Sequence, residues 1–337
     1  MEKRKSSITL LDRLDSVLSQ GDESERIYAV YDMADAKEPD SAFRLARHLL
    51  VENSQAVREA IVSSLTNSDC SMAHDILFGM FLLPDAYLRN AAVTIFGSKS
   101  EDAVSYLSAK LDHADKEVRK LILDAMVEIG SPDSVSAIRA SLHDDSQNVK
   151  ITAVEYLGRL GDKGSVDDIM ELYGRDEEPM LRVAIMETLL LMEDGRTIKR
   201  IVRQHLSEGA GGDTADLYLP QLLRMTARAG DIEDLEAIIH SIEDLKAYMG
   251  DVINALKEAK RRFAAESMPQ AVYDLIYMVA KKALDNLPLK EAHLYGILQL
   301  LKGGETEGMK ALLGRVRESV PEAVMRELDG EDSADNG

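Results

Sequence analysis

The feature that most constrains this chain is a basic residue that recurs every 30 to 32 residues between residues 26 and 182. We call these the anchor residues; they are Arg26, Arg58, Arg89, Arg119, Lys150 and Arg182. Residues one before and three, four and seven after each anchor are apolar, with Glu25 as the one exception. These offsets mark one face of an α-helix. Each anchor is therefore predicted to lie on a helix with one buried face, here called an anchor helix.

Both ends of the predicted anchor helices carry signals. Four residues before the anchors stand residues suited to a helix start: Asp22, Ser54, Asp85, Asp115, Ser146 and Glu178. Glycines suited to a left-handed helix end follow at Gly97, Gly130, Gly161 and Gly195. A further apolar stripe, such as Val135, Ile138 and Leu142, predicts a second helix in each unit. One helical pair cannot bury both apolar faces, whereas stacked pairs share a continuous core.

Two segments resemble a known family of helical repeats. They run from Asp115 to Gly130 and from Ser146 to Gly161, and they are similar to HEAT repeats, in particular the short kind found in phycobilisome lyases. The resemblance covers about residues 21–207 and implies an all-α fold, a right-handed α-solenoid (superhelix) of HEAT-like helical pairs. It also implies that the anchors are structural and pair with acids of neighbouring repeats in a ladder.

The repeat pattern divides the chain into five predicted parts. Residues 1–20 contain a capping helix and residues 21–207 hold six HEAT-like repeats, followed by a Gly-rich break at 208–213. Residues 214–320 remain helical without anchors, as degenerate pairs or as a separate helical bundle. Residues 321–337 form an acidic tail too polar to build a core.

Composition narrows the classes of partner. The formal net charge of −20 disfavours the phosphate backbone, so we expect no nucleic-acid binding. No stretch of 18 uninterrupted apolar residues occurs, and we expect no membrane association. The single cysteine excludes an internal disulfide and a multi-Cys zinc site. A cytoplasmic protein is expected.

Motifs for catalysis are not found, so the sequence predicts no catalytic residue, no cofactor and no metal site. His113 and His143 fall at equivalent ends of successive second helices, next to acids, but a helix C-terminus also favours histidine without any metal. Cys70 and His74 lie one helical turn apart, a spacing that can give a thiolate. A lone cysteine on a repeat helix is more often a small core residue.

Two basic clusters stand out on this acidic chain. The first, the basic stripe, lies on one helix face and is a candidate docking site for an acidic partner: Arg196, Lys199, Arg200 and Arg203. The alternative is that the stripe pairs with acids of the next unit, among them Asp231, Glu233 and Glu236. The second cluster is Lys257, Lys260, Arg261 and Arg262.

The fold class favours a non-catalytic adaptor or scaffold. Its concave face, expected to be lined by the second helices, would bind one or more proteins, because curved solenoids offer extended binding surfaces. The resemblance to phycobilisome lyases leaves open an enzyme or chaperone that attaches a tetrapyrrole to a client protein. A regulatory subunit of a signalling assembly is the third hypothesis.

Overall fold

The computed structural model describes residues 9–99, 101–208, 215–264, 269–304 and 306–319. Every regular element in these ranges is a helix, and the chain is an all-α solenoid. Its internal contacts group it into two units, Met1–Thr188 and Leu189–Gly337.

The first unit alternates anchor helices with second helices after a capping helix, α1 (Leu10–Gln20). The anchor helices are α2 (Glu23–Asp35), α4 (Gln55–Thr66), α6 (Ala86–Gly97), α8 (Lys116–Ile129), α10 (Gln147–Leu160) and α12 (Pro179–Met192). The second helices are α3 (Ser41–Leu49), α5 (His74–Phe81), α7 (Glu101–Ser108), α9 (Pro132–Ala140) and α11 (Val166–Arg175). Short 3₁₀ turns adjoin them at Ser71–Ala73, Ser141–His143 and Lys163–Ser165.

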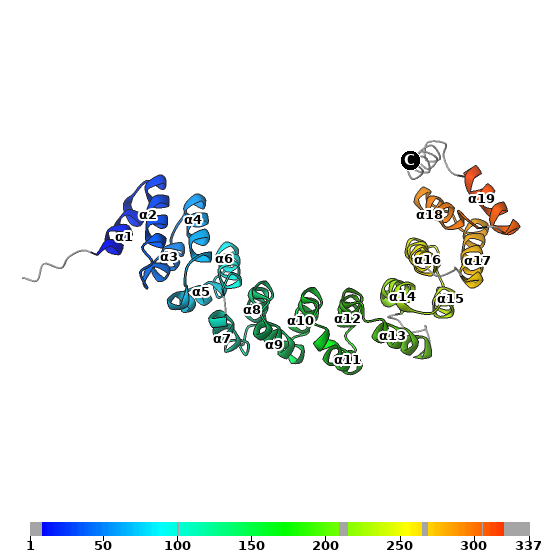
Figure 1. Cartoon of the computed structure of the whole chain (residues 1–337), viewed down its shortest axis with the longest axis horizontal. Coiled ribbons are helices and arrows are strands. Elements are labelled where there is room, and N and C mark those ends of the chain that lie inside the picture. The colour runs from blue at the N-terminus through cyan, green and yellow to red at the C-terminus, as the bar shows by residue number, and fades with distance from the viewer. Residues whose placement is uncertain (1–8, 100, 209–214, 265–268, 305, 320–337) are drawn as a thin grey trace, which may run out of the picture. The chain divides into compact units, whose positions relative to one another are not determined.

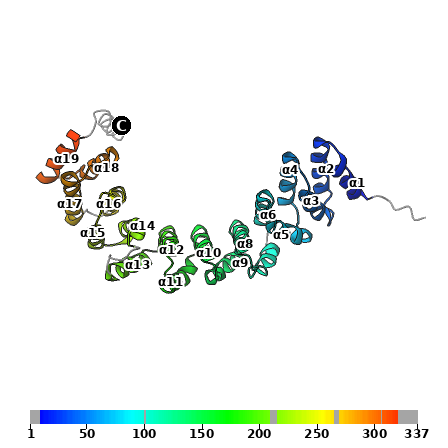
Figure 2. The ribbon, with the colours of Figure 1, turned by 180° about the vertical axis from the view of Figure 1, so that it is seen from behind.

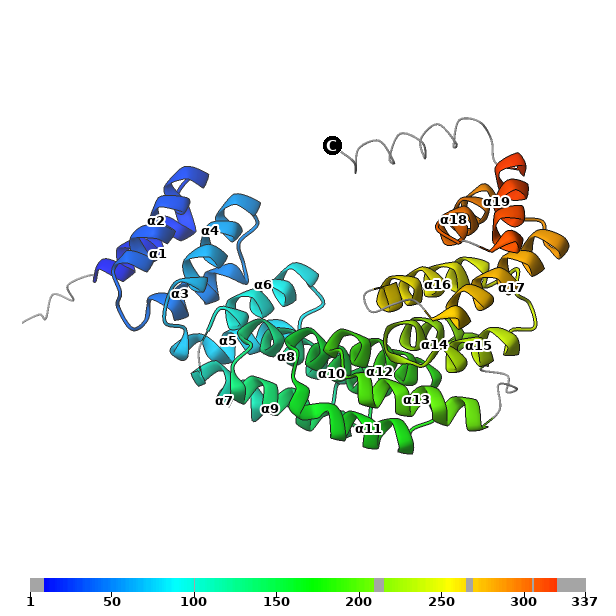
Figure 3. The same ribbon diagram turned by 45° about the vertical axis from the view of Figure 1, so that its right-hand side comes forward.

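Within the first unit the anchor helices form one row and the second helices another (Figure 1). The separation persists from behind (Figure 2) and after rotation (Figure 3). The anchor row lies on the inner side of this unit's curve, so the expectation that second helices line the concave face is wrong. An apolar stripe shows which side of a helix is buried, but not which row of helices is on the inside of the bend.

The buried stripe follows the predicted register. Ile61, Ile122 and Leu157 are fully buried in their anchor helices, as are most residues at equivalent offsets. The core is mainly aliphatic, and around α5 to α7 His74 and Phe96 are part of a cluster of rings.

The helix starts follow the sequence more closely than the helix ends do. The side chains of Asp22, Ser54, Asp85, Asp115 and Glu178 accept hydrogen bonds from backbone N–H groups of the first turn, whereas that of Ser146 does not. A left-handed residue occurs eleven positions after four anchors, at Lys37, Gly130, Gly161 and Glu193.

Two predicted helix-ending glycines are therefore wrong. Gly97 is the last residue of α6, which continues into a right-handed Ser98, and Gly195 begins α13. The left-handed position after α12 belongs to Glu193, a non-glycine residue that an apolar-and-glycine pattern cannot locate.

The second unit consists of α13 (Gly195–Glu208), α14 (Ala215–Ala229), α15 (Ile232–Ser241), α16 (Met249–Ala264), α17 (Gln270–Asn286), α18 (Glu291–Leu301) and α19 (Glu307–Ser319), together with the end of α12. Helices α14, α16 and α18 pack in succession, and α13, α15, α17 and α19 do the same. This two-row stacking is that of repeated helical pairs.

The division between the units falls inside α12, whereas the sequence places a soft boundary at 208–213. Residues 209–214 and the acidic tail at 321–337 lie outside the described ranges, so the predicted break and tail stay predictions. Among the described residues, no helix combines the length and the apolarity needed to cross a membrane.

Candidate functional site

The anchor arginines join each anchor helix to the turn before it. Five anchors donate to a backbone carbonyl five or six residues earlier, just past the preceding helix; the acceptors are the carbonyls of Gly21, Glu52, Leu83, His113 and Asp176. The N···O distances lie between 2.6 and 3.1 Å. A guanidinium has donors in several directions, so one side can satisfy a helix end while the other faces an acid.

Three anchors also pair with an acid 25 or 26 residues further on. Arg26 pairs with Glu52 at 3.1 Å, Arg119 with Asp144 at 2.7 Å and Asp145 at 2.6 Å, and Lys150 with Asp176 at 2.5 Å. Arg58 and Arg182 instead lie over the rings of Tyr87 and Tyr173. The ladder implied by the family resemblance is thus present at three of the six anchors in the described part of the chain.

The inner face of the first unit is defined by the residue five after each anchor. With about 100° per residue, this offset lies opposite the buried stripe. Along the row the residues are Tyr31, Ser63, Thr94, Asp124, Glu155 and Glu187. The face thus changes from aromatic and hydroxyl groups on α2 to α6 into three successive acids on α8 to α12. We call Asp124, Glu155 and Glu187 the acidic column.

Two acids of this column, Asp124 and Glu155, are less compensated than the acids beside the anchors, although the nearby Lys120 ammonium favours both charges. Partial burial, together with the neighbouring Glu187 carboxylate, raises the pKa of Glu155. Burial also raises the pKa of Asp124, although the Tyr156 hydroxyl donates to this carboxylate. A shift in this direction means that the environment disfavours the negative charge. A cation arriving from outside would relieve the cost.

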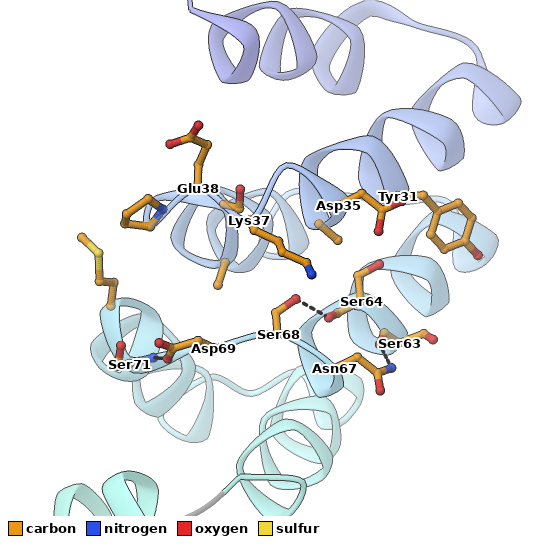
Figure 4. A pocket seen from close by; sticks show the side chains of 15 residues that line it. Tyr31, Asp35, Lys37, Glu38, Ser63, Ser64, Asn67, Ser68, Asp69 and Ser71 are labelled. Carbon is orange, nitrogen blue, oxygen red and sulfur yellow. Dashed lines mark hydrogen bonds between the residues drawn. The ribbon is translucent and has the colours of Figure 1, made fainter.

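Two cavities open onto the same face between neighbouring anchor helices. One, of about 520 Å³ between α6 and α8, has Thr94, Asp124 and Glu128 in its walls. The other, of about 740 Å³, lies between the ends of α2 and α4 (Figure 4). Lys37 points across it toward Ser64 and Ser68, with Tyr31 beside Asp35 at one end.

Two of the four residues of the basic stripe on α13 form ion pairs within the second unit. Lys199 and Arg203 pair with the same carboxylate of Asp231, at 2.8 and 2.7 Å, and the hydrogen bond from Lys199 holds the pKa of Asp231 below its usual value. Arg203 also approaches Asp234 at 3.8 Å. Arg196 and Arg200 are exposed. Two of the four residues of the stripe, Lys199 and Arg203, thus follow the alternative interpretation, in which the stripe pairs with acids of the next unit.

The other clusters noted in the sequence are engaged in packing or helix ends. Cys70 is buried, and burial raises the pKa of its thiol, which opposes a thiolate. The Lys260 ammonium donates to carbonyls at the end of α18, and Arg262 donates to Thr226 and Gly230.

The two histidines considered as metal ligands lie just after second helices: His113 follows α7, and His143 ends the 3₁₀ turn after α9. His113 Nδ1 accepts from the Asp115 N–H. No group of three or more His, Cys, Asp or Glu side chains able to hold a metal occurs among the residues that the structure describes.

Comparison with protein families gives the same repeat. A model of HEAT repeats matches residues 75–147, 104–190 and 137–217. Residues 75–217 are HEAT repeats. The matched ranges begin within α5, α7 and α9, so a HEAT repeat of this chain is best counted from a second helix to the following anchor helix.

Solved structures resemble the chain only distantly. An engineered protein is 13% identical, with 91% of this chain and 98% of that chain covered and a TM-score of 0.33. The complex of CpcE and CpcF of phycocyanin lyase from a Nostoc species is 16% identical, with 77% and 97% covered and a TM-score of 0.30. No curated protein matches the sequence significantly.

The acidic column was not singled out from the sequence, although a signal for it exists. Sequence motifs for chemistry join residues close together in the chain, whereas Asp124, Glu155 and Glu187 are 31 and 32 residues apart. When the repeats are aligned on their anchors, these acids share the fifth position after the anchor and therefore lie on one face.

Proposed function

We propose that this HEAT-repeat protein is a scaffold that binds a basic, extended segment of a partner protein along the inner face of its first unit. The observation that carries the proposal is the acidic column, three acids at one repeat position, at two of which, Asp124 and Glu155, burial disfavours the negative charge. Charge complementarity with lysine and arginine side chains gives both faster association and selectivity.

The repeat geometry specifies the spacing of the basic residues in the partner. Neighbouring packed helices lie about 8–10 Å apart. A polyproline II segment advances about 3.1 Å per residue with three residues per turn, so every third side chain lies on the same face. A segment that runs along the row would therefore meet successive acids of the column with every third residue. The anchors do not compete for the column, because those that pair with acids use Glu52, Asp144, Asp145 and Asp176.

The basic stripe remains a second, separate proposal. The exposed Arg196 and Arg200, with the partly exposed Lys199 and Arg203, would contact an acidic segment of a partner. It ranks below the inner face because Asp231 already neutralises part of it.

Site-specific photo-cross-linking tests which row meets the partner. A cross-linking residue at Thr94 reports on the inner face, and one at the exposed Ser136 on α9 reports on the second helices. We expect partner peptides cross-linked from position 94 alone, and we expect these to contain lysine or arginine at every third residue. Equal yields from both positions, or cross-links to acidic peptides, would contradict the proposal.

A further inference from the structure

Lys99 fills the notch between the ends of α4 and α6. Its ammonium donates to the carbonyls of Leu65, Thr66 and Ser68, at 2.6, 2.9 and 2.7 Å. An ammonium has three donors, and here all three are used. The carbonyls at a helix end carry partial negative charge, which a cation stabilises. The notch is thus a gap between two helix ends that is lined by backbone carbonyls, and here a lysine side chain of the chain itself occupies it.

The corresponding notch one repeat earlier lacks that lysine. Lys99 stands ten residues after its anchor, and the equivalent residue after Arg58 is Ser68. The Ser68 hydroxyl turns back to its own helix and donates to the Ser64 carbonyl at 2.7 Å. The equivalent carbonyls at the end of α2 belong to Met33, Ala34 and Ala36, and no side chain among the described residues donates to them. The cavity of about 740 Å³ lies at this place, with Ala34 in its wall (Figure 4).

The lining of the cavity suits a cation. Asp35, Glu38 and Asp69 carry three negative charges against the one positive charge of Lys37. Hydrogen bonds from the backbone and side chain of Ser71 lower the pKa of Asp69, which keeps that carboxylate charged. Ser41 also lines the cavity; it is 5% exposed, and its hydroxyl has no hydrogen-bond partner. A buried hydroxyl left unpaired carries a cost, so it too favours an occupant.

We propose that this cavity binds the primary ammonium of a lysine side chain from the partner protein, as Lys99 occupies the next notch from within the chain. The inference rests on the proposed function, because the lysine belongs to the segment on the inner face, where Tyr31 and Ser63 lie at the column's own repeat position. Lys37 competes for the same space. Its ammonium points into the cavity and makes no ion pair with a described residue, so it swings outward when the partner lysine enters.

The probe is Nα-acetyl-lysine N-methylamide, and binding is followed by the backbone amide NMR signals of residues 63–71. We expect saturable shifts in these signals with the lysine probe and none with its Nε-acetylated form. A lysine peptide should bind more tightly than n-butylamine. Equal affinity for butylamine would overturn the assignment to a protein side chain, and equal shifts from the Nε-acetylated probe would overturn the ammonium.

Two substitutions test the mechanism. Ser68→Lys supplies the missing lysine from within the chain and should weaken probe binding about tenfold or more, the equivalent of one charge-assisted hydrogen bond. Ser136→Lys on α9 adds the same charge elsewhere and should leave binding within about twofold. Lys37→Ser, which removes the competitor, should strengthen it. Lys37→Ser also keeps the proposal open to refutation if Ser68→Lys does not fold, since unchanged or weaker binding would overturn it.

The same variants separate this inference from the proposed function. If Ser68→Lys leaves partner binding intact while neutralisation of the acidic column weakens it, the lysine cavity is wrong and the scaffold stands. If neither change affects partner binding, the inner face is not the docking surface and both proposals fall.

Discussion

The guanidinium of Arg119 and the carboxylate of Asp144, 25 residues apart in sequence, form an ion pair of 2.7 Å in which the side chains are only 9% and 10% exposed. The same guanidinium donates to the His113 carbonyl at 2.7 Å. One side chain thus joins the start of α8 to the turn before it and to the turn before α10.

Removal of this guanidinium should be costly. Arg119→Met leaves a buried carboxylate without its partner, and we expect a loss of about 3 kcal/mol or more in the free energy of unfolding. The control is Arg159→Met, because Arg159 pairs with Glu128 at a similar distance but on an exposed surface. That change should cost about 1 kcal/mol or less. Urea unfolding of both variants measures the difference, and similar losses would contradict the architectural role of Arg119.

Acidic pH should weaken the ion pair between Arg119 and Asp144. Burial by itself would raise the pKa of Asp144, but hydrogen bonds from Arg119 and the Ser146 N–H outweigh it and hold the pKa below the usual 3.8. Because the lower pKa belongs to the folded state, the carboxylate's contribution is complete above about pH 4 and is lost as the pH falls through the folded-state value.

The free energy of unfolding should therefore fall more steeply with acid in the natural protein than in Asp144→Asn, measured by urea titrations between pH 2 and 7. Asp133→Asn, at an exposed acid of α9, serves as control and should keep the natural slope. An unchanged slope in Asp144→Asn would remove this residue from the stabilising ladder.

The repeat register has its own test. Leu157 is fully buried in α10, whereas Lys163 is exposed in the turn that follows. Leu157→Asp places an unpaired carboxylate in the core and should cost about 4 kcal/mol or more, or prevent folding. Lys163→Asp should change stability by about 0.5 kcal/mol. Thermal and urea midpoints that agree between the two would mean that the register is wrong.

The sequence predicted the helical repeat because each copy repeats the same apolar offsets, and the buried Ile61, Ile122 and Leu157 follow that register. The prediction of helix ends failed where no glycine marks the left-handed residue. A left-handed residue is needed eleven positions after the anchor, and Lys37 and Glu193 occupy that position without the signal that glycine gives.

The candidate site was harder to predict than the fold. The pairing of Lys199 and Arg203 with Asp231 was among the alternatives, since the acids of the next unit were known from the sequence. The cavity beside Ser68 was not among the alternatives, because it lies where this repeat has Ser68 at the position that Lys99 occupies in the next repeat. Such a difference is visible only when the copies are compared position by position in three dimensions.

Charge reversal should affect stability differently in two pairs of residues of the basic stripe. Arg200→Glu with Arg203→Glu breaks the pair with Asp231 and places like charges together, so we expect a loss of about 1 kcal/mol. Arg196→Glu with Arg200→Glu reverses the two exposed residues and should change stability by about 0.5 kcal/mol or less. Thermal unfolding and a partner-binding assay are measured side by side. A weaker, less salt-dependent interaction in both variants would favour docking of an acidic segment; an earlier melt in the first variant alone, with normal binding in both, would favour architecture.

The most direct test of the central claim measures how tightly a peptide with lysine at every third residue binds to the acidic column. The test variant combines Asp124→Asn, Glu155→Gln and Glu187→Gln. It should not destabilise the protein, because burial disfavours the charges of Asp124 and Glu155, and the amide introduced by Asp124→Asn keeps an oxygen that can accept from the Tyr156 hydroxyl. The control combines Asp102→Asn, Asp133→Asn and Asp167→Asn, which neutralise exposed acids on the second helices α7, α9 and α11. Calorimetry at 0.15 M salt should show about tenfold weaker binding for the column variant, from three pairs of about 0.5 kcal/mol each, and a change within twofold for the control. Equal affinities for the two variants would contradict the account.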